Sequence, residues 1–356
     1  MKDKTLTKNY SIHDLLKIKI NTKKRFFGEN VYNNPLSYFE VENLEDSQVD
    51  INLNIGEFKP NLNKKFIVDH KYYLDENYLY LKDNGKSSSW KLEIRGLNDD
   101  RIDINFEGNI KGISSMFFAD ALAFEVALKP VIELILDSKG YFLAHAGAIT
   151  KKDSSILLFG MAGSLKSSII LNGVKNEYNA LGDDKVIIDI KNKLIYSFPI
   201  YHQLFDYTVD VGKEELSKLQ KLKFFSSSFN DNKTSTFWET KPVKFDRAFV
   251  LERINKNELI NFKELETEVA IEKILANNKN EFYVSIIPSL LQKNNFPNYM
   301  QAYSYVFPES KLSNHWNELK SNLKENFNDL KFYELELPEK YNKDTFEEIF
   351  EIIGEN

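Results

Sequence analysis

The sequence predicts an α/β protein with two domains, a β-rich N-terminal domain over residues 1–115 and a larger α/β domain over residues 116–356. Three observations support this. Up to about residue 110, short runs of alternating apolar and polar residues are separated by Asn, Asp and Gly, which is the pattern of half-buried strands and turns. Near Met116 the pattern changes to apolar residues at helical spacing. From there on, strand-like and helix-like segments alternate, as is typical of layered α/β folds.

The N-terminal domain is expected to contain short strands joined by tight turns. Gly85 and Gly96 stand in two of these turns, where glycine supplies the positive φ that tight hairpins need. No residue of this domain has the pattern of a catalytic group. The predicted strands are Val49–Leu53, Lys65–Val68, Tyr78–Leu81, Trp90–Ile94 and Ile102–Phe106.

A helix followed by a hairpin opens the second domain. Apolar residues at helical spacing predict a helix over Phe117–Leu136, which Pro130 is expected to kink or divide. The runs Tyr141–Thr150 and Ser155–Phe159, joined by a polar turn, predict an antiparallel hairpin. Its second strand leads directly into a glycine-containing loop, and a helix is expected to start at Ser167.

Strands and helices are predicted to alternate through the rest of the chain. The strands are Tyr178–Leu181, Lys185–Asp189, Leu194–Phe198, Arg247–Leu251 and Lys331–Leu337, and the helices are Glu264–Leu275, Pro308–Asn326 and Thr345–Ile353. The segment Phe224–Thr240, rich in Ser, Asn, Asp and Lys, is expected to be a mobile loop. Asp183 and Asp184 follow the first of these strands, so we expect them at a strand end.

Composition and charge exclude several classes of function. With 42% hydrophobic and 13% aromatic residues, the chain has too much apolar bulk for a disordered protein. The net charge is −6 and the charges are interspersed, so no basic face for nucleic acid is expected. The absence of cysteine excludes disulfides, zinc-thiolate sites and thiol nucleophiles. Neither a signal peptide nor a membrane-spanning apolar run is visible, so a cytoplasmic protein with no membrane partner is expected.

The segment from Gly160 to Ser168 predicts a nucleotide-phosphate-binding loop. The phosphate-loop pattern is Gly, four residues, then Gly-Lys-Ser/Thr, and this chain reads Gly-Met-Ala-Gly-Ser-Leu-Lys-Ser from Gly160. In such loops backbone N–H groups surround the phosphates, a lysine neutralises them and a hydroxyl holds Mg²⁺. The expected nucleotide-binding residues are Gly160, Ala162, Gly163, Ser164, Leu165, Lys166, Ser167 and Ser168.

Leu165 departs from the pattern because it stands where glycine is expected. If this position requires a positive φ, leucine there costs on the order of 1 kcal/mol or more. The alternative is that the segment is only a strand-to-helix connection. A preceding strand, a following helix and the downstream carboxylates Asp183 and Asp184 favour the phosphate loop.

Three separated motifs together resemble the HPr kinase/phosphorylase family. They are His145-Ala146-Gly147-Ala148, the loop from Gly160 to Ser167, and Leu181-Gly182-Asp183-Asp184, at intervals similar to those of HPr kinases. This family shares its phosphate-loop core with the ATP-dependent phosphoenolpyruvate carboxykinases. The hairpin that feeds the loop also looks like this family. The resemblance therefore implies an α/β fold with an HPr-kinase/PEP-carboxykinase-like P-loop core behind a β-rich N-terminal domain.

The resemblance extends from about Phe117 to Leu275, including Ser197-Phe198-Pro199 and Phe249-Val250-Leu251-Glu252-Arg253. The N-terminal domain is closer to the β-rich leaders of HPr-kinase-like proteins found beside peptide-modification enzymes. Two family features are not recognisable, namely the Glu-x-x-Gly-x-Gly segment that adds a metal carboxylate and the arginine loop that engages the acceptor. Asp206, Asp210 and Arg253 are candidate substitutes that spacing does not single out.

Residue by residue, the resemblance implies a kinase site. Lys166 would hold the β and γ phosphates of ATP, and Ser167 with Asp183 would hold Mg²⁺. Asp184 would be the base that accepts the proton of the acceptor hydroxyl, and His145 would lie near the γ-phosphate or the Asp pair. The alternatives are a polar strand end for the two aspartates and a hydrogen-bonded core residue for His145.

The first hypothesis for function is thus an ATP- and Mg²⁺-dependent kinase that phosphorylates a hydroxyl, a Ser or Thr of a protein or peptide or a hydroxyl of a small molecule. The second is a non-catalytic or degenerate nucleotide-binding module derived from such kinases, which Leu165 and the unrecognised arginine loop favour. Phosphoenolpyruvate carboxykinase activity is disfavoured because no second set of His, Lys and Asp ligands for Mn²⁺ is visible. Related kinases form symmetric oligomers, so the resemblance leaves a homo-oligomer open.

Overall fold

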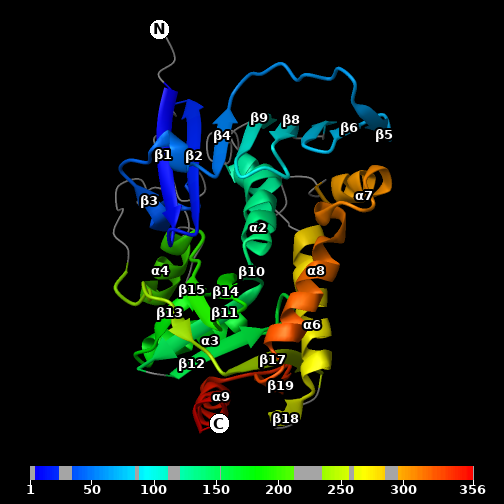
Figure 1. The fold of residues 1–356 in the computed structure, drawn as a ribbon. Coiled ribbons are helices and arrows are strands. Elements are labelled where there is room, and N and C mark those ends of the chain that lie inside the picture. The colour runs from blue at the N-terminus through cyan, green and yellow to red at the C-terminus, as the bar shows by residue number, and fades with distance from the viewer. Residues whose placement is uncertain are drawn as a thin grey trace.

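The computed structural model describes residues 5–23, 34–84, 88–110, 121–152, 154–211, 235–255, 260–284 and 296–355. Within these ranges the protein is a mixed α/β structure whose strands form three sheets (Figure 1). Three predicted features, Gly85, the start of the predicted helix at 117–120 and most of the predicted loop at 224–234, lie outside the described residues.

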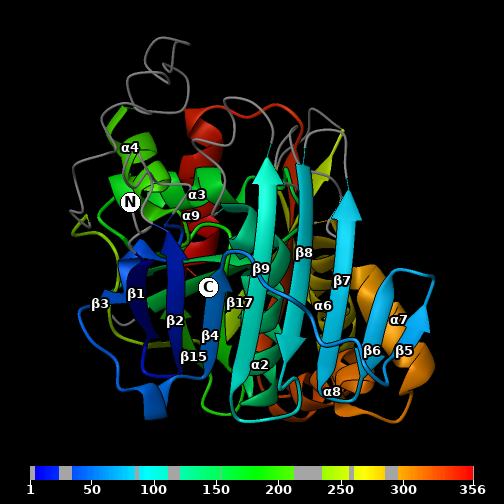
Figure 2. The ribbon, with the colours of Figure 1, turned by 90° about the horizontal axis from the view of Figure 1, so that it is seen from above.

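The N-terminal sheet has its described strands in the order β3-β1-β2-β4-β9-β8-β7-β6-β5, and Figure 2 shows them side by side. Neighbouring strands are antiparallel, apart from the parallel pairs β2–β4 and β4–β9. The bounds are β1 Thr5–Ile12, β2 Leu16–Lys23, β3 Glu40–Val41, β4 Ile51–Ile55, β5 Phe66–Val68, β6 Tyr72–Asp75, β7 Tyr78–Asn84, β8 Ser88–Arg95 and β9 Ile102–Ile110.

The five strands predicted for this part of the chain are confirmed as β4, β5, β7, β8 and β9, with ends that differ by a few residues. Strands β1, β2, β3 and β6 were not predicted. Gly96 has φ +81°, as the turn prediction requires, and a Cβ there would lie 2.3 Å from the carbonyl oxygen of Arg101. The β8–β9 turn therefore needs glycine for both its conformation and its space.

A helical segment covers one face of this sheet. It begins in the described chain at Ala121, forms a π-turn over Phe124–Leu128 and continues as α2, Lys129–Ser138. Pro130 was expected to kink or divide this helix; the helix is not divided, because Leu128 and Lys129 both keep right-handed helical dihedrals, and a π-turn ends two residues before the proline. A widened turn accommodates the proline ring and its missing N–H. Apolar side chains of this segment, among them Phe124, Leu128 and Ile132, share one hydrophobic core with Ile104 and Phe106 of the sheet.

Two further sheets are formed by the rest of the chain. The four-stranded sheet is antiparallel and has the order β10-β14-β15-β16, with β10 Tyr141–Ala144, β14 Val186–Asp189, β15 Leu194–Ser197 and β16 Val243–Lys244. The six-stranded sheet has the order β13-β11-β12-β17-β19-β18, with β13 Asn179–Gly182, β11 Ala146–Lys151, β12 Ser154–Phe159, β17 Arg247–Ile254, β19 Lys331–Pro338 and β18 Asn261–Leu265. Its pairs β12–β17 and β17–β19 are parallel.

The prediction of one strand over Tyr141–Thr150 was wrong at His145. The chain leaves the four-stranded sheet after Ala144 and enters the six-stranded sheet at Ala146, so His145 is the residue between two sheets. The antiparallel hairpin of the prediction is confirmed for β11 and β12. Alternation along a continuous apolar run cannot show such a break, because both strands are buried on both faces.

Helices pack on both faces of the six-stranded sheet (Figure 1). On one face lie α3, Lys166–Lys175, and α9, Lys343–Glu355, which contribute Ile169, Ile170 and Ile349 to one core. On the other face lie α6, Thr267–Val284, and α8, Lys311–Asn326, in a second core. The described chain also contains α4, His202–Val211, and α7, Phe296–Val306, which were not predicted.

The predicted helix Glu264–Leu275 was wrong at its start and too short. Residues up to Leu265 belong to β18, and α6 runs from Thr267 to Val284. The predicted helix Pro308–Asn326 begins instead at Lys311, because Ser310 caps it by accepting a hydrogen bond from the Ser313 N–H at 3.1 Å.

The core of the N-terminal sheet continues into the second half of the chain. It includes Leu143, Ile187, Phe198 and Tyr299 beside the residues of the sheet itself. The division at residues 115 and 116 therefore remains a prediction. Among the described residues, no helix combines the length and apolar character needed to cross a lipid bilayer.

Candidate functional site

The loop from Gly160 to Ser168 connects the end of β12 to the start of α3. Strand β12 is parallel to β17, and β17 to β19, so the loop lies at the carboxyl ends of the parallel strands. This edge is the usual place for ligand sites in open α/β sheets. The tip of the loop, Met161 to Gly163, is exposed, whereas Ser164 and Lys166 are buried.

Two positions fix the shape of this loop. At Gly160 a Cβ would lie 2.5 Å from the Ser164 hydroxyl oxygen and 2.9 Å from the Leu251 carbonyl oxygen, so a larger residue does not fit. Leu165, directly before α3, has φ +73° and ψ +7°. It thus adopts the left-handed conformation that glycine has in the phosphate-loop pattern, at an expected cost on the order of 1 kcal/mol.

The side chain of Lys166 folds back into the loop. Its Nζ donates to the carbonyl oxygen of Gly160 and, at 3.4 Å, to that of Met161, and it lies 3.0 Å from Nε2 of His145. Burial lowers the pKa of Lys166 to about 8. The loop therefore encloses an ammonium group that is charged at neutral pH, with the N-terminus of α3 beside it.

His145 is held by helix α6 through both of its backbone polar groups. Its N–H donates to Asn278 Oδ1 at 2.7 Å, and its carbonyl oxygen accepts from Asn277 Nδ2 at 2.9 Å. Asn278 Nδ2 also donates to the Leu143 carbonyl oxygen at 2.9 Å. These bonds satisfy the backbone where the chain passes from one sheet to the other, and so they fix the position of the imidazole.

The imidazole of His145 lies between the lysine and two carboxylates. Nδ1 is 3.5 Å from Glu281 Oε2 and 4.0 Å from Asp184 Oδ1. Burial lowers the pKa of His145 to about 3, so the ring is neutral at pH 7. Because Nε2 faces an ammonium donor, we assign the ring proton to Nδ1, which faces the carboxylates.

Asp184 is surrounded by cationic groups. Burial favours its protonated form, but the positive charges of its neighbours outweigh burial and hold the pKa of Asp184 below its usual value. The largest of these contributions comes from His145 when it is protonated, and Lys129, Lys185 and Lys166 add to it. Burial and the neighbouring charge of Asp184 raise the pKa of Glu281. The two carboxyl groups thus have their pKa values pushed in opposite directions, which is common where one group is to stay ionised.

His145, Asp184 and Glu281 together form the group of side chains in the described chain with the geometry to hold a metal ion. One ligand atom of each lies within 4.8 Å of the others. The predicted metal ligand Asp183 is not in this group. Ser167, the other predicted ligand, donates from Oγ to the backbone oxygen of Asp183 at 3.5 Å. The role of Ser167 and Asp183 in metal binding therefore stays a prediction.

The other predicted loop residues and the three candidate substitutes lie at different distances from the site. Ala162 and Gly163 are at the exposed tip, and Ser168 is in the first turn of α3, where its carbonyl oxygen accepts from Asn172 Nδ2 at 2.8 Å. Of the candidate substitutes, Arg253 does reach the loop, since one of its Nη atoms donates to the Gly163 carbonyl oxygen at 3.2 Å. Asp206 instead accepts from the Trp238 indole N–H at 2.7 Å. The side chain of Asp210 lies outside the described residues.

Sequence reasoning missed Glu281 and the asparagine pair of α6, together with Lys129 and Lys185. The predicted helix ended at Leu275, before all three α6 residues. Asparagine has a low helix propensity, so two adjacent asparagines inside a helix were the one sequence signal that these residues have a special role. Nothing in the sequence shows that they contact His145, which is more than 130 positions away.

Comparison with protein-family models finds no family that matches this chain, and none of the curated proteins matches it significantly. The site must therefore be judged from its own geometry. A half that carries positive charge, made of the loop, Lys166 and the start of α3, lies directly beside a half that carries Asp184 and Glu281. Such a pairing can hold a phosphate group together with a cation or a proton acceptor.

Proposed function

We propose that the chain is an ATP- and Mg²⁺-dependent kinase of the HPr-kinase-like type that phosphorylates a hydroxyl of a protein, peptide or small molecule. The observation that carries the proposal is the position of Lys166 Nζ, inside the loop and 3.0 Å from His145, whose other ring nitrogen faces Asp184 and Glu281. A cationic phosphate cradle and a candidate base are thereby next to each other.

In this proposal each residue acts as its surroundings allow. Lys166 and the backbone N–H groups before α3 bind the phosphates, and His145 keeps the lysine in place. The acceptor oxygen attacks the γ-phosphorus, the bond to the ADP oxygen breaks, and Asp184 takes the hydroxyl proton. Asp184 is suited to this step because it is ionised at neutral pH.

The residues present also suit a divalent cation. Asp184 and Glu281 supply carboxylate oxygens, which Mg²⁺ prefers, whereas Nδ1 of His145 carries the ring proton and faces these oxygens. When bound, the cation would neutralise charge on the phosphates.

The test is transfer of labelled phosphate from ATP to a panel of Ser/Thr peptides and small hydroxyl compounds. Asp184→Asn should lower transfer at least about 100-fold, while the affinity for ATP, measured by calorimetry, changes only a few-fold. Transfer that survives this substitution would show that Asp184 is not the base. Absence of ATP binding to the unmodified chain would refute the proposal altogether.

A second candidate is a non-catalytic nucleotide-binding module. The left-handed conformation of Leu165 favours it, because a strained loop with a side chain at this position is less suited to tight binding than one with glycine. Calorimetry with ATP and Mg²⁺ followed by a turnover assay separates the two. Binding without turnover of any acceptor supports the module.

A further inference from the structure

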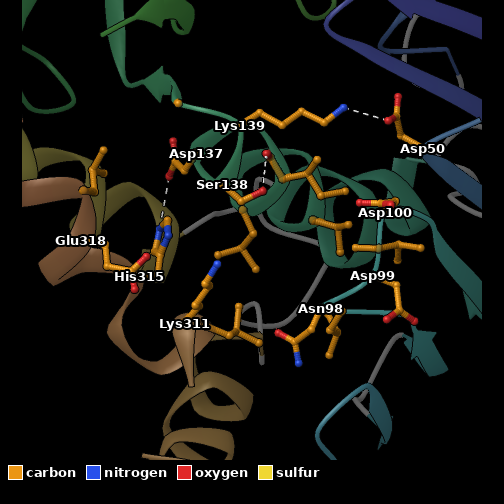
Figure 3. A pocket seen from close by; sticks show the side chains of 18 of the residues that line it. Asp50, Asn98, Asp99, Asp100, Asp137, Ser138, Lys139, Lys311, His315 and Glu318 are labelled. Carbon is orange, nitrogen blue, oxygen red and sulfur yellow. Dashed lines mark hydrogen bonds and ion pairs between the residues drawn. The ribbon is translucent and has the colours of Figure 1, made fainter. Parts of the chain in front are cut away.

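A second site is suggested by a cleft of about 900 Å³ at the C-terminal end of α2, and Figure 3 shows the side chains that line it. Its walls are the C-terminal end of α2, the β8–β9 turn and helix α8. None of the residues that line it belongs to the loop or to the group around His145. Its volume lies within the range of small-molecule sites.

The lining of the cleft is acidic. Its described residues include five carboxylates, Asp50, Asp99, Asp100, Asp137 and Glu318, but only two lysines, Lys139 and Lys311. Lys139 is already paired, since its Nζ lies 2.8 Å from Asp50 Oδ1. The walls thus carry more negative than positive charge, and they favour a cation.

Two polar side chains are buried in the inner wall. Asp137 and His315 face each other, with Oδ2 and Nε2 separated by 3.3 Å (Figure 3), and their side chains are only 4% and 9% exposed. Neither Oδ atom of Asp137 nor Nε2 of His315 has a well-aligned hydrogen-bond partner among the described side chains. The nearest buried ammonium, Lys185, is paired with Glu133 at 3.2 Å. The inner carboxyl therefore has no cation of its own.

The C-terminal end of α2 also favours a cation in the cleft. A helix carries partial negative charge at its C-terminus, which cations stabilise. The last turn of α2 contains no basic residue, and Asp137 and Ser138 at this end line the cleft. This field is independent of the side-chain charges.

An apolar surface completes the cleft. Val131 and Leu134 of α2 and Leu312 and Leu319 of α8 are buried residues that line it. A simple metal ion gains nothing from such a surface, whereas an organic ligand with an apolar stem does.

We propose that this cleft binds a small organic cation, an ammonium or guanidinium group carried on an apolar stem. The head group meets the exposed carboxylates and the end of α2, with the buried Asp137 carboxyl behind them, and the stem lies on the leucines and valine. The proposal is independent of any nucleotide chemistry at the 160–168 loop.

Three probes that differ only in the head group test it: 4-phenylbutylamine, 4-phenylbutan-1-ol and 4-phenylbutyrate. By calorimetry with the full chain, the amine should bind at least about five-fold more tightly than the alcohol and the carboxylate should not bind. Raising the salt concentration should weaken amine binding. Equal binding of amine and alcohol, or no binding of the amine, would overturn the proposal.

A matched pair of variants on α8 locates the site. Glu318→Gln removes an exposed carboxylate of the cleft, and Glu325→Gln removes an exposed one outside it. The first should weaken the amine at least about three-fold and the second should not. Equal effects of the two α8 variants would contradict the assignment to this cleft.

Discussion

Two buried histidines of this molecule face carboxyl groups, and their surroundings differ. His145 lies between Lys166 and the carboxylates of Asp184 and Glu281, with its backbone held by α6. His315 faces Asp137 without a lysine of its own in hydrogen-bonding contact. Burial lowers the pKa of both histidines, to about 3 and about 4. Both are therefore neutral at pH 7.

The difference between the two regions lies in the balance of charge around a similar pair. Around Asp184, the positive charges of neighbouring histidine and lysine side chains outweigh burial, and the pKa of the carboxyl is lowered. Around Asp137, burial and the charge of Glu133 raise the pKa well above its usual value. The first region has cations to offer to an anionic ligand, whereas in the second the lysines do not offset the burial of Asp137. Histidine next to a carboxylate is thus not by itself a sign of one kind of chemistry.

The first test of this comparison removes hydrogen bonds that hold the backbone at His145. Asn278→Ala deletes a hydrogen-bond acceptor for the His145 N–H and a donor for the Leu143 carbonyl oxygen, both buried. Leaving buried backbone groups without partners should lower the free energy of unfolding by about 2–4 kcal/mol. Urea denaturation measures this change.

The control is Asn280→Ala, two residues further along the same helix. Asn280 is only half-buried, and its replacement makes the same change in helix propensity. We expect a change in unfolding free energy below about 0.5 kcal/mol. Similar losses for both variants would mean that α6, and not the contacts of Asn278, determines the stability of this region.

Local features around His145 could be predicted from the sequence. The strand, the loop and the helix around Gly160 follow one another directly, and the turn residues and the change of period mark their ends. The sequence analysis left open whether Leu165 has a positive φ, and its φ is +73°. Asp183 and Asp184 follow β13 directly, as expected.

Features that depend on distant contacts could not be predicted. Glu281 and Asn278 reach His145 from a helix that comes more than a hundred residues later. The break at His145 was hidden by burial on both sides. In the N-terminal sheet, β2 alternates clearly as Leu-Lys-Ile-Lys-Ile and pairs with β1 across a short turn, but β1 reads as a mostly polar run and this hairpin was missed. The parallel pairing of β2 with β4 joins segments about 30 residues apart, which a local pattern does not show.

A second test of the comparison is the pH dependence of stability that His315 causes. The pKa of His315 is about 4 in the folded protein, against 6.5 for an unburied histidine, so the unfolded chain binds the proton first as pH falls. Its contribution to stability is therefore present above pH 6.5 and lost toward pH 4. Asp137, with its raised pKa, acts in the opposite direction, and the nearby Lys279 opposes protonation of His315.

The variant His315→Gln measures how much of the pH dependence of the unfolding free energy comes from this histidine. Between pH 7 and pH 5, the unmodified chain should lose about 1–2 kcal/mol more unfolding free energy than this variant. The control is His70→Gln, which replaces an exposed histidine. This variant should lose as much unfolding free energy between pH 7 and pH 5 as the unmodified chain. Urea denaturation at the two pH values measures it. If His315→Gln loses as much unfolding free energy between pH 7 and pH 5 as the unmodified chain, the ring of His315 is accessible to protons in the folded state.

The smallest expected effect concerns Leu165, whose strain is found only on the His145 side. Among the described residues that line the cleft, positive φ occurs at Gly140 alone, where it costs little. Leu165→Ala and Leu165→Gly remove the same half-buried side chain, but only glycine relieves the left-handed conformation. The glycine variant should therefore unfold with a free energy about 0.5–1 kcal/mol above that of the alanine variant, as measured by urea denaturation. Since alanine otherwise restricts the unfolded chain more than glycine, the opposite order would mean that the loop does not hold this conformation in solution.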